Sequence, residues 1–154
     1  VMIPKDIFEN IGYFNNLLKN GEDTEMWIRI ALNYQVAFCS KVTACIVRKS
    51  CENHLSMSKH TIERLKIFEF FEEEESKCSS LKKYLDLNRF SIAVNLKMNG
   101  DFENYILLKK SILNKNLNFK QRLVLKCPRV ILIGLKKFQR RLIEQNIYLS
   151  PFKR

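Results

Sequence analysis

The residues from Gly21 to Arg29 combine the types and the spacing that acid–base chemistry uses. Glu22 and Asp23 follow a glycine and precede apolar residues at helical spacing, so they are expected at the start of a helix. Backbone N–H groups at a helix start stabilise an ionised carboxylate, and such a carboxylate can act as a general base toward a hydroxyl nucleophile. Helix capping needs the same residues, so the spacing alone favours capping and leaves catalysis open.

The elements expected around this segment are mixed at first and helical later. A short helix over 4–10, a loop over 13–21 and a helix over 22–33 precede two short β-branched strands over 36–38 and 42–47. After a polar loop, helices are expected over 61–75, 79–98, 101–113, 119–126 and 128–145. The predicted fold class is therefore α/β for the first 60 residues, followed by an all-α extension over 61–154.

The charge of the chain is concentrated in its last third. Among 154 residues, 27 Lys and Arg oppose 16 Asp and Glu, which gives a net charge of +11. Residues 101–154 hold 13 basic and 3 acidic side chains, whereas residues 1–100 are nearly balanced. Such asymmetry indicates a surface that meets anions, or a solvated basic helix without a partner.

Several classes of protein are excluded by composition. No apolar run approaches the ~20 residues of a membrane-spanning helix. The five cysteines are odd in number and form no Cys-x-x-Cys pair, so neither a disulfide framework nor a structural zinc site is expected. The acidic run 72–75 offers no metal site because successive helical residues point in different directions, and a solvated helix end is expected there.

Three stretches of the first 30 residues share an order and a spacing with a known family. They are Ile3-Pro4-Lys5, Ile11-Gly12-Tyr13-Phe14-Asn15 and Gly21-Glu22-Asp23-Thr24-Glu25-Met26-Trp27-Ile28-Arg29. Together they resemble the second half of a bacterial family 2 glycosyltransferase of the inverting GT-A type. Arg48, Asn53 and Ser56 resemble the Arg…Asn..Ser element that follows in this family. Pro128 and residues 147–151 of the helical tail are also similar to bacterial members.

The resemblance implies a role for each matching residue. Asp23 would be the general base that takes the proton of an acceptor sugar hydroxyl as it attacks the anomeric carbon of a nucleotide-sugar. Glu22 would orient the acceptor or support Asp23, and Trp27 would pack beneath the acceptor or only against the core. Arg48 and His54 are candidates for the loop that closes over the donor diphosphate, although a surface salt bridge also explains Arg48.

The family's metal-binding and nucleotide-binding parts have no counterpart in this sequence. Neither an Asp-x-Asp motif nor a Gly-rich phosphate loop occurs, so the complete enzyme is expected to hold Mg²⁺ or Mn²⁺ through ligands outside this chain. The opening Val1-Met2-Ile3-Pro4 is typical of the end of a buried strand, which indicates a piece of a longer protein. Residues 1–60 are then the acceptor side of the catalytic domain, and these 154 residues alone are expected to be inactive.

The last predicted helix has the pattern of a membrane-surface helix. Ile131, Leu135, Phe138 and Leu142 share one face, and the cations Lys136, Lys137, Arg140 and Arg141 lie off it. This pattern predicts a protein that lies peripherally on a membrane surface. The resemblance implies that this surface is the cytoplasmic face of the cell membrane and that the acceptor is a glycan or is lipid-linked. A helix packed on its own domain is the alternative, and nucleic-acid binding is not expected. The competing function is a non-catalytic basic module that binds membrane or an acidic partner.

Overall fold

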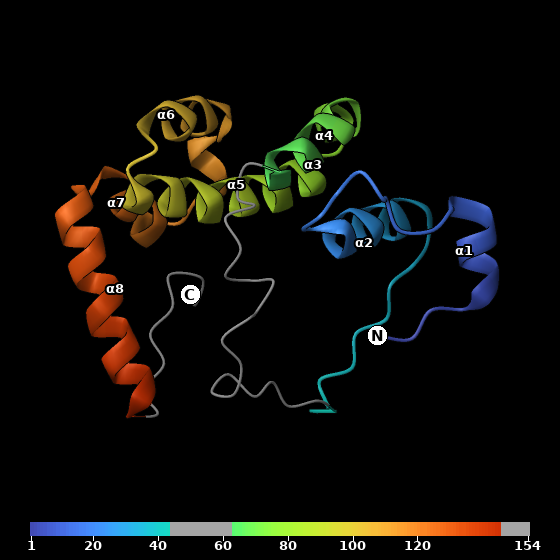
Figure 1. Ribbon diagram of the computed structural model, residues 1–154. Helices are drawn as coiled ribbons and strands as arrows, with labels where there is room; N and C mark the ends of the chain where they lie inside the picture. The colour runs from blue at the N-terminus through green and yellow to red at the C-terminus, as the bar shows by residue number, and fades with distance from the viewer. Residues whose placement is uncertain (44–62, 146–154) are drawn as a thin grey trace. The chain divides into compact units, whose positions relative to one another are not determined.

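The computed structural model describes residues 1–43 and 63–145 (Figure 1). The chain divides into two compact units, Val1–Phe71 and Glu72–Arg154. In the described parts of both units the regular secondary structure is entirely helical. The expectation of an α/β GT-A domain is therefore wrong for these residues.

Two strands were predicted in the first unit, over 36–38 and over 42–47, and neither forms in the described residues. Residues 36–38 have no regular secondary structure, and Val36 and Phe38 are 68% and 91% exposed. A strand is stabilised by the ladder and the face that its neighbours supply, and the described residues provide no such neighbour here. β-Branched composition was thus not sufficient to form a strand. Residues 44–47 lie outside the described residues.

The first unit is built around the second helix of the chain. Its elements are α1 (Lys5–Ile11), α2 (Glu22–Asn33), the 3₁₀-helix η2 (Glu63–Leu65) and α3 (Lys66–Phe70). The buried apolar side chains of this unit are Leu18, Met26, Ile28, Ile30, Ile67, Phe68 and Phe71. The predicted helices over 4–10 and 22–33 are observed as α1 and α2. Pro4 and Gly21 directly precede their first turns, as the sequence pattern indicated.

The second unit is organised by one long helix. Its elements are α4 (Glu72–Lys77), α5 (Ser79–Asn99), α6 (Phe102–Ser111), η3 (Asn114–Asn116), α7 (Phe119–Lys126) and α8 (Arg129–Glu144). Helix α5 contacts α4, α6, α7 and α8 (Figure 1). Six of the buried apolar residues of this unit lie on α5, and the full set among the described residues is Leu81, Leu85, Phe90, Ile92, Ala93, Leu96, Tyr105, Leu108, Ile112, Leu117, Leu125 and Leu132.

Local sequence signals account for the helix ends of this unit. Gly100 adopts a left-handed conformation with φ 87° and ends α5, and the Asp101 side chain accepts a hydrogen bond from Asn104 N at the start of α6. Asn118 and Gln121 form a reciprocal capping box on α7. The helix expected over 61–75 is instead interrupted, because α3 ends at Phe70 and α4 begins at Glu72.

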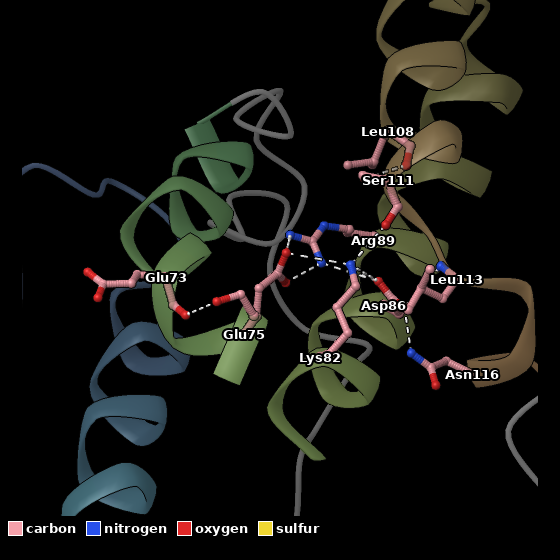
Figure 2. Close-up of polar contacts among 10 residues, drawn as sticks. Glu73, Glu75, Lys82, Asp86, Arg89, Leu108, Ser111, Leu113 and Asn116 are labelled. Atoms are coloured by element: carbon pink, nitrogen blue, oxygen red, sulfur yellow. Dashed lines mark hydrogen bonds and ion pairs between the residues drawn. The ribbon is translucent and has the colours of Figure 1, made fainter. Parts of the chain in front are cut away.

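A neutral group of four charged side chains joins α4 and α5 to the segment after α6 (Figure 2). The Arg89 guanidinium binds Glu75 through two hydrogen bonds of 2.6 and 3.0 Å and reaches Asp86 at 3.2 Å. Lys82 Nζ lies 2.9 Å from Asp86 Oδ1 and donates to the Ser111 carbonyl at 2.9 Å. We call Glu75, Lys82, Asp86 and Arg89 the buried charge cluster.

Asp86 connects this cluster to the chain beyond α6. Its Oδ2 accepts hydrogen bonds from Leu113 N at 3.0 Å and from Asn116 Nδ2 at 2.7 Å, and the residue is fully buried. The expectation of a solvated acidic run over 72–75 therefore holds for Glu72, Glu73 and Glu74, which are exposed, and is wrong for Glu75. Burial of Glu75 is tolerated because Arg89 neutralises it.

The last two helices are held to α5 and α6 by polar contacts with carbonyl groups. Lys97 Nζ and Tyr105 Oη each donate to the Leu125 carbonyl near the end of α7, both at 2.8 Å. Arg129 Nε, in the first turn of α8, donates to the Met98 carbonyl at 2.9 Å. These bonds satisfy carbonyl groups that a helix end leaves without an intrahelical partner.

Candidate functional site

The start of α2 presents the predicted general base at the surface. Asp23 is exposed, and its Oδ1 accepts hydrogen bonds from Thr24 N at 2.6 Å and Thr24 Oγ1 at 3.2 Å. Among the described residues, Oδ2 has no hydrogen-bond partner. One carboxylate oxygen is therefore held by the neighbouring residue while the other is open to an acceptor hydroxyl, which is the arrangement a general base needs.

A tight turn fixes the chain immediately before Asp23. Gly21 has φ 91°, and a Cβ at this position would lie 2.6 Å from Ile67 Cδ1. Only glycine fits both the left-handed backbone and the close approach of Ile67. The entry to α2 is thus set by packing against α3, and this limits the positions that the Glu22 and Asp23 backbone can take.

Arg29 connects two of the three stretches on which the family resemblance rests. Its guanidinium pairs with Glu25 through hydrogen bonds of 2.6 and 3.0 Å, and Glu25 is only 5% exposed. The same guanidinium donates to the Tyr13 carbonyl at 2.7 Å and to the Ile11 carbonyl. The Ile11–Tyr13 turn and the Gly21–Arg29 segment are therefore parts of one local structure rather than independent motifs.

Trp27 lies one helical turn after Asp23. The spacing of four residues puts both side chains on the same side of α2, where Asp23 is exposed and Trp27 is half-buried. Glu22 is also half-buried. A carboxylate beside a partly exposed indole suits a sugar, because an indole ring offers an apolar surface to the C–H face of the ring.

Two predicted donor-site residues, Arg48 and His54, lie outside the described residues. Within the first unit the structure brings another cation to the start of α2, because Arg64 Nε lies 3.7 Å from the position of a Cβ at Gly21. This Nε is buried and has no hydrogen-bond partner among the described residues. The sequence pattern gave no signal for Arg64, because more than 40 residues separate it from the turn it contacts.

The α8 apolar stripe, which consists of Ile131, Leu135, Phe138 and Leu142, is largely uncovered. Ile131, Leu135 and Phe138 are 51%, 49% and 55% exposed, and Leu142 is half-buried. Leu132, in the first turn, is the one described side chain of α8 that is fully buried. Among the described residues, α8 is therefore buried most deeply at its start, and about half of the surface of Ile131, Leu135 and Phe138 stays exposed.

The four cations predicted to face anionic lipid are all exposed on α8: Lys136, Lys137, Arg140 and Arg141. No carboxylate among the described side chains forms an ion pair with them, in contrast to the cations of the buried charge cluster. Their charge is therefore available to solvent or to an anionic surface.

Two further observations concern membranes and metals. None of the helices in residues 1–43 and 63–145 has the length and apolar character required to cross a bilayer. The same residues contain no group of three or more His, Cys, Asp or Glu side chains placed to hold a metal ion.

Comparison of the chain with models of known protein families, with curated proteins and with solved structures finds no match.

Sequence reasoning missed the structural role of Arg29 and the buried charge cluster. The spacing of four between Glu25 and Arg29 could have indicated their ion pair, because such residues are neighbours on a helix. The carbonyl partners of Arg29 and the pairing of Glu75 with Arg89, 14 residues apart, are tertiary contacts with no local signature.

Proposed function

We propose that this chain is the acceptor-side part of an inverting glycosyltransferase that acts in bacterial cell-surface polysaccharide synthesis. The proposal is supported by the Asp23 carboxylate, which is exposed at the start of α2 on a segment held by Arg29 and Gly21. In the proposed reaction Asp23 removes the proton of the acceptor hydroxyl. The resulting oxygen nucleophile attacks the anomeric carbon of a nucleotide-sugar, and the nucleoside diphosphate leaves from the opposite face.

The other residues near Asp23 take supporting roles in this proposal. Trp27 packs beneath the acceptor sugar and Glu22 orients it, since both flank Asp23 on α2. Arg48 and His54 contact the donor diphosphate. In the complete enzyme Mg²⁺ or Mn²⁺, held by ligands outside this chain, would stabilise the charge of the leaving diphosphate.

The decisive experiment replaces Asp23 in the complete enzyme. Asp23→Asn keeps the size of the side chain and removes its basicity, so sugar transfer is expected to fall by at least about 100-fold. Asp6→Asn is the matched control, because Asp6 is an exposed first-turn carboxylate of α1. Near-normal transfer by a folded Asp23→Asn enzyme would show that Asp23 is only a helix-start residue.

A second proposed function is attachment to the cytoplasmic face of the membrane through α8. It is supported by the exposure of the α8 apolar stripe beside cations that form no ion pair with any described side chain. Each cation near an anionic leaflet contributes on the order of 1 kcal/mol, and apolar burial adds to it. This function needs no catalysis, so it also holds if the chain is a non-catalytic basic module.

Vesicle co-sedimentation tests this attachment. The chain is expected to bind vesicles that contain phosphatidylglycerol, and the binding should weaken as salt screens the charges. Replacing Lys136, Lys137, Arg140 and Arg141 by Glu should abolish it. Unchanged binding by the charge-reversed chain would contradict the assignment to α8.

A further inference from the structure

Helix α7 exposes a second apolar surface, separate from the apolar stripe of α8. Phe119 and Leu123 are 74% and 53% exposed, and their spacing of four places them on one side of the helix. Lys120, Arg122 and Lys126 are exposed around them. An exposed phenylalanine and leucine surrounded by cations form a small amphipathic surface.

The opposite side of α7 is fixed in the core, so this surface cannot turn inward. Gln121 and Leu125 are 2% and 4% exposed. The capping box between Asn118 and Gln121 holds the first turn, with bonds of 2.8 and 2.9 Å. At the other end, Lys97 and Tyr105 bind the Leu125 carbonyl. Phe119 and Leu123 are therefore kept at the surface by four polar bonds beneath them.

The chain around α7 has charge of a single sign. Residues 104–143 hold eleven Lys and Arg and no Asp or Glu. Positive charge of this density is complementary to a surface of closely spaced anions. The interleaved leucine and phenylalanine favour a lipid surface over nucleic acid, because an aliphatic side chain gains from entering the acyl region and cannot stack on a base.

We propose that α7 is a second contact with an anionic lipid surface, in which Phe119 and Leu123 enter the headgroup region and Lys120, Arg122 and Lys126 contact the lipid phosphates. This inference rests on the proposed attachment through α8 and extends it to two helices. Two contacts on one folded unit restrict its orientation on the membrane more than a contact through one helix does.

Tryptophan placed at single positions tests this directly. Trp27 is the one tryptophan of the chain, so Trp27→Phe gives a background without indole fluorescence. In that background Phe119→Trp reports on α7 and Phe138→Trp reports on α8. With phosphatidylglycerol vesicles both are expected to shift to shorter wavelength and to be quenched by brominated lipid. Tyr84→Trp, at an exposed aromatic of α5, is expected to change little.

The outcomes distinguish the contact through α7 from the attachment through α8 on which it rests. A shift at Phe138→Trp without one at Phe119→Trp overturns the α7 contact and leaves attachment through α8 intact. The absence of both shifts overturns both proposals. An equal shift at Tyr84→Trp shows general adsorption and overturns the assignment to α7, as does binding to duplex DNA or RNA in place of vesicles.

Charge reversal provides an independent readout. Lys120→Glu together with Arg122→Glu is expected to weaken vesicle binding about tenfold or more, because two attractive charges become repulsive. Lys83→Glu together with Lys66→Glu is the matched control, because both lysines are exposed outside residues 104–143. Equal loss in the two double variants would contradict a specific contact through α7.

Discussion

Helices α5 and α8 belong to the same unit and both carry many cations, but they use them in opposite ways. Helix α5 buries Arg89 and Lys97 and supplies each with an acceptor within the unit. Helix α8 leaves its cations at the surface together with Leu135 and Phe138. The difference shows that basic composition alone does not define a binding surface, because a neutralised cation is part of the fold.

The strongest test of this comparison removes one acid of the buried charge cluster. Asp86→Ala leaves one buried positive charge of Lys82 and Arg89 without a counter-charge, and it removes the hydrogen-bond acceptor of Leu113 N and Asn116 Nδ2. The unfolding free energy of the second unit should therefore fall by about 3–5 kcal/mol. Urea unfolding followed by circular dichroism measures the loss. Glu73→Ala, which removes an exposed pair with Lys77, should change stability by less than about 1 kcal/mol.

The same reasoning applies to Arg29 in the first unit, with a smaller effect. Arg29→Met leaves the buried Glu25 carboxylate without its partner and removes the donor to the Ile11 and Tyr13 carbonyls. The unfolding free energy of the first unit should therefore fall by about 2–3 kcal/mol. Fluorescence of Trp27 follows unfolding of this unit. The control Lys5→Met removes an exposed pair with Glu9 and should be nearly neutral; equal losses would mean that Arg29 is not a structural residue.

The smallest effect on stability is expected on α8. Leu135→Ser together with Phe138→Ser should change the unfolding free energy by about 0.5 kcal/mol or less, because both side chains are half-exposed. The same change should strongly reduce vesicle binding. Leu85→Ala on α5, a fully buried position, should cost about 2–5 kcal/mol. A comparable cost on α8 would mean that its stripe packs against the protein and is not a docking surface.

The elements that sequence predicted well are those with local causes. Gly100, Asp101 and Asn118 mark helix ends through their own backbone and side-chain bonds, so α5, α6 and α7 were found close to their observed bounds. The strand over 36–38 failed because a strand depends on partners distant in the sequence. The break at Phe71 within the helix over 61–75 also had no local signal.

The features of the candidate sites also fall into those with local causes and those that depend on tertiary packing. The position of Asp23 at a helix start and the single apolar face of α8 followed from helical spacing, whereas spacing left open whether that face packs on its own domain. The restraint of Asp23's segment by Arg29 and the approach of Arg64 to Gly21 depend on how distant segments pack. Sequence patterns therefore located the surfaces, and the structure was needed to identify the residues that hold them in place.

The contact of Arg129 with the end of α5 has a consequence for the order in which the second unit opens. Arg129 caps the Met98 carbonyl and lies against Gly100, so the first turn of α8 is expected to open together with the end of α5. Leu132 is buried, whereas none of the described side chains of α8 after Gly134 is fully buried, and the Cβ position of Gly134 has open space around it. Backbone amides should exchange with solvent far faster after Gly134 than before it. The boundary between residues that unfold with the core and residues that open locally is therefore expected within α8, near Gly134.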